Sequence, residues 1–258
     1  MEIGIFIIGL LAGVFSGLFG IGGGIIMVPT LIAIFGMNIL NANATSLAAM
    51  LLPVGVFGVI NYYKAGYVNI KESLLIAIGL FVGSFFGATI AIHVHESLLS
   101  KLYAIYLLYI ALNYLDIKSY LFPNKNKSNN NSDDPVGNIN IWMFIGLGVF
   151  AGVIAGVFGK GGGLIIVPIL IKYFRYDPKA ATATSLTALQ LPVGLPSVIV
   201  YANKGYLNYV FAALMAFGIF LGVFFGSKIA LNISNTLFKK VYAIFLLGVA
   251  TYMIFKYV

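Results

Sequence analysis

The sequence repeats itself at a fixed offset of 139 residues, and no other feature constrains the fold as strongly. Residues 13–70 align with residues 152–209 without a gap, and 30 of the 58 aligned pairs are identical. The alignment continues downstream, where Gly83 coincides with Gly222. The repeat therefore predicts two copies of one structural unit.

The composition indicates that both copies lie in a membrane. Of the 258 residues, 15 are Lys or Arg and 7 are Asp or Glu, so that 9% are charged, against roughly 25% in an average soluble domain. Hydrophobic residues make up 61% of the chain and the mean hydropathy is +1.02. This composition excludes a soluble enzyme, which needs more charged groups on its surface. The chain has no cysteine, and with Arg175 as its single arginine the net charge of +8 does not predict a nucleic-acid partner.

The chain divides into two membrane regions and a polar linker. We assign residues 1–115 to the first membrane repeat and residues 141–258 to the second. Residues 116–140 are rich in Asn, Lys, Ser and Asp, and such a composition cannot bury apolar surface. We expect this segment to be a solvated linker outside the bilayer.

Each repeat contains five apolar segments bounded by glycines, prolines and the few charges. These segments are residues 3–20, 24–36, 42–62, 73–92 and 97–115, followed by 141–159, 163–175, 180–201, 209–231 and 236–256. The third, fourth and fifth segments of each repeat are long enough to cross a bilayer, which takes about 20 helical residues. The second segments are too short, and we expect each to be the returning arm of a hairpin that turns at a glycine triplet.

The distribution of basic residues predicts the orientation of the two repeats. If each hairpin returns the chain to its starting side, the repeats are inverted, and eleven basic residues lie on one side of the membrane against three on the other. The eleven are Lys64, Lys71, Lys118, Lys125, Lys127, Lys172, Arg175, Lys179, Lys228, Lys239 and Lys240. Parallel repeats would divide the basic residues seven against seven. Because cytoplasmic loops are enriched in Lys and Arg, we expect both termini outside the cell and the linker in the cytoplasm.

The predicted fold is therefore an all-α integral membrane protein made of two inverted repeats. Each repeat would contain a glycine-broken helical hairpin plus three transmembrane helices. Secondary transporters of this kind place their substrate near the midplane, where the N-termini of interrupted helices converge.

The motif F-G-x-G-G-G-x-x-x-V-P begins at Phe19 and again at Phe158, and it carries the strongest indication of a site. Its glycines allow the chain to turn and leave backbone N–H groups at a helix start, where an anion is favoured. The residues concerned are Gly22, Gly23, Gly24, Gly161, Gly162 and Gly163. Close helix packing is the alternative role for such glycines, and we expect it for the glycines spaced four apart at Gly9, Gly13 and Gly17.

Lys160 takes the place of Ile21 in the second copy of this motif. A charged side chain at membrane depth is costly and indicates a function, and a fixed cation beside a helix N-terminus suits an anion. The alternative is that the turn reaches the membrane interface, so that Lys160 extends its amine into water.

A second element, A-T-S-L, precedes L-P-V-G in both repeats and supplies small hydroxyls. Such hydroxyls can cap backbone N–H groups, or they can donate to an anion in a cavity. The candidate lining consists of Thr45, Ser46, Thr184, Ser185 and Gln190. We expect Pro53 and Pro192 to kink the helices that follow.

All seven Asp and Glu residues fall in loops or at segment ends. No carboxylate is therefore placed to bind a cation or to relay a proton within the membrane segments. The pattern disfavours an intramembrane protease or a metal carrier, and it predicts neither a metal site nor a cofactor.

The duplicated stretches GLFGIGGGIIMVPTL and GVFGKGGGLIIVPIL, each followed by ATSL, resemble the TauE/SafE family of sulfite exporter-like permeases. The resemblance covers both repeats. It implies a secondary carrier, usually an exporter, for small sulfur-containing or organic anions such as sulfite or a sulfonate.

We therefore expect a multi-pass protein of the inner membrane that moves a small anion through a central site. Its expected partners are that anion and the lipid bilayer, with a homo-oligomer left open. Two alternatives share these features: an anion channel, and a membrane accessory subunit that transports nothing.

Overall fold

The computed structural model describes residues 2–95, 140–159 and 162–234, with isolated positions at 97–99, 101–102, 105, 237, 244, 247–248 and 251. Helices are the regular secondary structure throughout this described part, which contains no strand. The linker and most of both fifth segments lie outside the described residues, so the division at residues 115 and 141 stays a prediction.

Within the described residues, the two repeats contain the same series of five helices. In the first repeat these are α1 (Glu2–Phe19), α2 (Gly24–Phe35), α3 (Ile39–Ala49), α4 (Val56–Lys64) and α5 (Ile70–Ala91). In the second they are α8 (Ile141–Phe158), α9 (Gly163–Lys172), α10 (Pro178–Ala188), α11 (Leu195–Asn203) and α12 (Tyr209–Asn232). Among the described helices, α1, α5, α8 and α12 are long and apolar enough to cross a membrane.

Five of the ten described helices carry a side-chain cap at their start. An Asn or Asp side chain accepts a hydrogen bond from a first-turn N–H at the N-cap positions Asn38, Asn69, Asn140, Asp177 and Asn208. α2, α4, α9 and α11 each begin after a glycine without any side-chain cap, and for α2 and α9 these glycines are Gly23 and Gly162.

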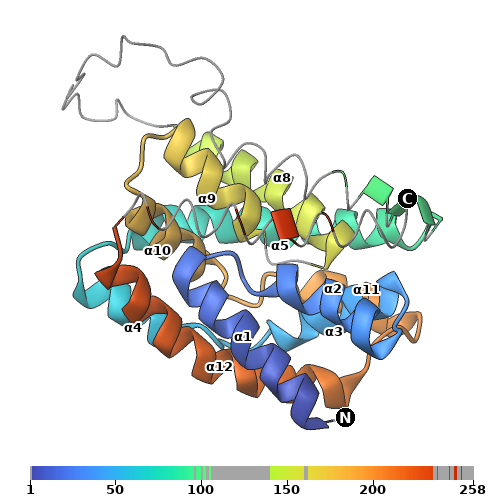
Figure 1. Cartoon of the computed structure of the whole chain (residues 1–258). Helices are drawn as coiled ribbons and strands as arrows, with labels where there is room; N and C mark the ends of the chain where they lie inside the picture. Colours follow the sequence, from blue (N-terminus) through green and yellow to red (C-terminus); the bar gives the residue numbers. More distant parts are fainter. Residues whose placement is uncertain are drawn as a thin grey trace.

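The long helices pair between the repeats rather than within them (Figure 1). α1 packs along α12 and α5 packs along α8. The small-residue faces bring the backbones together, since a Cβ added at Gly13 would lie 2.7 Å from the Ile219 Cα and one added at Gly152 would lie 2.9 Å from the Leu80 Cα. The packing role expected for Gly13 and its neighbours is confirmed.

The prediction for the third segments was wrong. We expected residues 42–62 and 180–201 to form kinked but continuous helices, whereas the structure contains two short helices in each place, α3 with α4 and α10 with α11. The break falls at the L-P-V-G sequence around Pro53 and Pro192. Proline has no N–H to donate and also drives the preceding residue out of the helical region, so the helix ends instead of bending.

α3 and α10 are largely buried, although they carry several polar side chains. The side chains of Asn43, Ser46, Thr182 and Ser185 are fully buried. Burying polar groups is costly unless they find partners, so these two helices are where a site is expected.

Candidate functional site

The two glycine motifs meet at the centre of the molecule. A Cβ added at Gly163, the first residue of α9, would overlap the Gly20 carbonyl oxygen and lie 2.8 Å from the Ile21 Cα. Gly20 and Ile21 belong to the break that leads from α1 into α2. The start of α9 in one repeat therefore lies against the corresponding break of the other.

The glycines at the two N-cap positions are required by the backbone. Gly23 has φ 71° and Gly162 has φ 46°, both in the left-handed region that glycine adopts without strain. Since neither helix start has a side-chain cap, the positive ends of the α2 and α9 dipoles are not offset by a capping oxygen. The positive end of a helix dipole favours an anion.

α3 and α10 pack across the repeats against these breaks. On α3, the Asn43 Nδ2 donates to the Val157 carbonyl at 3.0 Å, and a Cβ added at Gly159 would lie 2.7 Å from the Asn43 Oδ1. On α10, the Ser185 Oγ donates to the Gly20 carbonyl at 2.8 Å. Each break is thus flanked by a polar helix of the opposite repeat.

Several polar atoms on α3 and α10 have no partner within the protein. Among the described residues, the buried side-chain atoms without a hydrogen bond are Asn43 Oδ1, Ser46 Oγ, Thr182 Oγ1 and Thr184 Oγ1. All four side chains are fully buried. A buried polar group that lacks a partner costs about 1–3 kcal/mol, and such groups in a native structure mark a place for water, an ion or a ligand.

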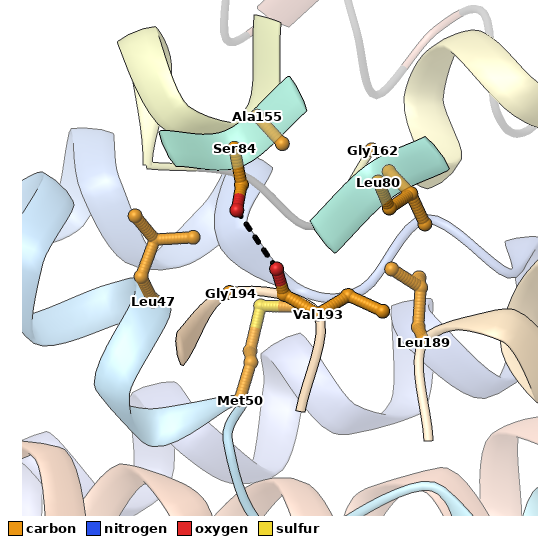
Figure 2. A pocket seen from close by; sticks show the side chains of 9 residues that line it. All are labelled: Leu47, Met50, Leu80, Ser84, Ala155, Gly162, Leu189, Val193 and Gly194. Atoms are coloured by element: carbon orange, nitrogen blue, oxygen red, sulfur yellow. Dashed lines mark hydrogen bonds between the residues drawn. The ribbon is translucent and has the colours of Figure 1, made fainter. Parts of the chain in front are cut away.

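Two small cavities lie between the breaks and the L-P-V-G loops. One is about 20 Å³, and Gly162, Ser84 and Val193 are among its lining residues (Figure 2). The other is about 10 Å³, and Gly22 and Gln190 line part of it. Each is about the size that a single water molecule needs, so neither cavity has room for an anion such as sulfite in this conformation.

The remaining predicted site residues have different surroundings. Thr45 accepts a hydrogen bond from the Asn208 N–H at 3.3 Å, beside the start of α12. Gln190 accepts from the N–H of Gly55, the residue before α4 of the other repeat, at 2.9 Å. Gly24 is the first residue of α2, and Thr184 carries one of the three unpartnered hydroxyls.

Lys160 and Gly161 lie outside the described residues. Their predicted role in substrate binding therefore stays a prediction. The flanking residues Gly159 and Gly162 are described on either side.

Sequence reasoning missed Asn43 and Thr182, which contact the breaks directly. A usable signal was present, because each stands three residues before the serine of A-T-S-L and hence on the same helix face. It also missed Tyr62 and Tyr201, two equivalent buried tyrosines whose hydroxyls donate to carbonyls at the ends of α1 and α8, at 2.9 and 2.8 Å.

Comparisons with known proteins agree on the class of protein. The family model described as "Sulfite exporter TauE/SafE" matches residues 5–253. The chain is 26% identical to the probable membrane transporter protein YunE of Bacillus subtilis, covering 91% of this chain and 89% of the relative. It is 28% identical to a probable membrane transporter protein of Methanocaldococcus jannaschii, covering 91% and 86%.

A further relative is the probable membrane transporter protein YdhB of Bacillus subtilis, with 27% identity over 94% of this chain and 95% of the relative. No solved structure matches the chain. The match to the family model spans nearly the whole chain and includes both glycine motifs. The chain belongs to the sulfite exporter TauE/SafE family of membrane transporters.

Proposed function

We propose that this membrane protein is a secondary carrier, working as an exporter, for a small sulfur-containing or organic anion such as sulfite or a sulfonate. The anion binds where the two glycine breaks meet, between α3 and α10. One observation carries the proposal: four fully buried polar side chains of α3 and α10, the two helices that pack against the breaks, have an atom without a protein partner.

The chemistry of these four atoms suits a small oxyanion. The hydroxyls of Ser46, Thr182 and Thr184 can each donate to an anion oxygen. The Asn43 Oδ1 only accepts, so it pairs with the hydroxyl of a protonated anion or with a water molecule bound to the anion. The uncapped starts of α2 and α9 add two positive dipole ends, and Lys160 completes the site in this proposal.

The carrier consists of two inverted repeats in this proposal. Support comes from the helix ends that pack along α12. The end of α2 lies at the start of α12, where the Phe35 and Phe211 rings are 5.8 Å apart. The start of α10, which follows α9, lies at the opposite end of α12, where the Lys179 Nζ donates to the Leu231 carbonyl at 2.9 Å. α12 has 24 residues and is about 36 Å long, which is enough to cross a bilayer. The C-terminal ends of α2 and α9, which are equivalent in the two repeats, therefore lie on opposite sides of the membrane in this proposal.

The cytoplasmic side of the carrier is the side where the α9–α10 turn lies. The Tyr176 hydroxyl donates to Glu72, which brings the turn containing Arg175 to the start of α5, next to Lys71. Lys179 lies at the same end. This clustering of basic residues supports the orientation with both termini outside, because cytoplasmic loops are rich in Lys and Arg.

The membrane potential drives export in this proposal. One negative charge that leaves a cell at about 100 mV, inside negative, gains about 2.3 kcal/mol. At about 1.4 kcal/mol per tenfold, this energy supports a concentration gradient of about fortyfold. A carrier driven in this way needs no carboxylate to couple protons.

The test is uptake and counterflow in proteoliposomes. Labelled sulfite, sulfate, sulfoacetate, taurine and acetate are offered at two clamped potentials, to the wild type and to Lys160→Ala. Lys204→Ala serves as the matched control, because Lys204 is exposed at the end of α11. We expect saturable, voltage-dependent flux of one sulfur oxyanion that is lost in Lys160→Ala and kept in the control.

The alternatives give different results in the same experiment. An anion channel gives flux that does not saturate and shows no counterflow. Folded protein that moves none of the five anions refutes the sulfur-anion proposal and favours the accessory subunit.

A further inference from the structure

We propose that Met50 and Leu189 form an apolar partition at the centre of the carrier and thereby set the largest anion that it transports. This inference rests on the proposed function, because a partition sets a size limit only for a protein that moves an anion. It adds two residues to the site that neither the glycine motifs nor the A-T-S-L elements contain.

The two central cavities are equivalent. Val54 and Gly55 line one cavity, and the aligned residues Val193 and Gly194 line the other. Each cavity also contacts a glycine of the triplet in the same repeat. The molecule therefore contains two cavities that the repeat relates to each other. We call these two cavities half-sites.

Met50 and Leu189 line both cavities. They are aligned residues of the two repeats, 139 positions apart, and each is the C-cap of its helix, α3 or α10. Figure 2 shows both side chains at the larger cavity, beside the hydrogen bond from Ser84 to the Val193 carbonyl. Each half-site is thus bounded by the same two apolar side chains.

The partition lies on the path of the anion in this proposal. Asn43, Ser46 and Met50 lie at positions i, i+3 and i+7 of α3 and its C-cap, on a single helix face. An anion that leaves the unpartnered oxygens of Asn43 and Ser46 along this face therefore meets Met50 next. The same spacing on α10 leads from Thr182 to Leu189.

The volumes show why the two side chains limit size. Cavities of about 20 and 10 Å³ hold about one water molecule each, so an anion fits only when the partition moves. Methionine has three flexible side-chain bonds and adapts to irregular spaces, whereas leucine is stiffer. Shortening both side chains merges the half-sites and admits larger anions.

The first experiment measures flux of a series of sulfonates that increase in size: methanesulfonate, ethanesulfonate, propanesulfonate and benzenesulfonate, with sulfite as the reference. We expect the flux of the largest sulfonate relative to sulfite to rise at least tenfold in the double variant Met50→Ala with Leu189→Ala. Met50→Leu is the conservative control and should keep the wild-type ratio, because leucine already fills the aligned position. Ile78→Ala, on an exposed face of α5, controls for a general loss of side-chain volume.

The second experiment needs no transport and uses the absence of cysteine from the chain. Val54→Cys and Val193→Cys are each treated with a membrane-impermeant thiol reagent from one face of the membrane at a time. With the partition intact, we expect the two cysteines to react from opposite faces. In the double alanine background, we expect each to react from both faces.

An unchanged size ratio in a double variant that still transports sulfite would overturn the partition. Labelling that stays restricted to one face in that background would also overturn it. A wild type that moves none of these anions would refute the proposed function instead, and the labelling pattern would then decide the partition alone.

Discussion

Ser46 and Ser185 occupy the same position in the two repeats, but their hydrogen bonding differs. The Ser185 Oγ donates to the buried Gly20 carbonyl at 2.8 Å, whereas the Ser46 Oγ has no partner in the protein. We therefore expect alanine to have different effects at the two positions. In our account Ser185 holds the break in place and Ser46 binds the anion.

The magnitudes follow from these partners. Ser185→Ala leaves a buried carbonyl without a donor, which costs about 1–3 kcal/mol of stability and lowers Tm by roughly 2–4 °C per kcal/mol. Ser46→Ala breaks no hydrogen bond within the protein, so Tm should stay the same or rise. It removes a hydrogen bond to a charged ligand, worth about 1.5–3 kcal/mol, which corresponds to roughly a ten- to hundredfold rise in Kd.

The assay combines thermal unfolding of the purified protein in detergent with calorimetric titration of sulfite. Both variants and the wild type are measured without ligand and with it. If Ser46→Ala lowers Tm as much as Ser185→Ala does and leaves Kd unchanged, the assignment of the unpartnered hydroxyl to the anion is refuted.

Three further predictions concern packing and hydrogen bonds. Gly222→Ala places a Cβ against the backbone of α1 and should lower the free energy of unfolding by about 1–3 kcal/mol. A Cβ at Gly146 would meet only open space, so Gly146→Ala should raise the free energy of unfolding by roughly 0.5–1 kcal/mol. Thermal unfolding of the two variants tests both expectations. Tyr201→Phe removes the buried donor to a carbonyl of α8 and should cost about 1–3 kcal/mol, and Tyr63→Phe, at a side chain that is 62% exposed, should leave Tm unchanged. Gln190→Leu removes the acceptor for the N–H at the start of α4 and should lower Tm in the same assay, so an unchanged Tm would show that this bond contributes nothing.

The repeat predicted more of the fold than hydropathy did. The offset of 139 residues predicts that each helix has an equivalent, and the described helices follow that order. Hydropathy alone failed at residues 42–62, because an apolar run of sufficient length looks the same whether or not the helix continues through Pro53. Whether the helix continues or ends depends on whether other residues form hydrogen bonds with the backbone groups that a break leaves free, as Gln190 does with the Gly55 N–H. Such contacts between repeats cannot be recognised from a local sequence pattern.

The candidate site was predicted in part. The glycine triplets and Ser46 could be identified because their residue types are unusual in an apolar chain. Thr45 could not be distinguished from Ser46, since only the packing of α3 decides that Thr45 contacts Asn208. Asn43 was overlooked although it lies on the same helix face as Ser46, and a count of helical spacing would have found it.

The most direct test of the central claim is equilibrium binding of labelled sulfite to the purified triple variant Ser46→Ala, Thr182→Val and Thr184→Val. The three hydroxyls have no partners in the protein, so the variant should fold with a Tm at or above that of the wild type. We predict one bound anion per chain in the wild type and no measurable binding in the folded triple variant. A triple variant that binds sulfite with the Kd of the wild type would contradict an anion site at the meeting point of the two glycine breaks.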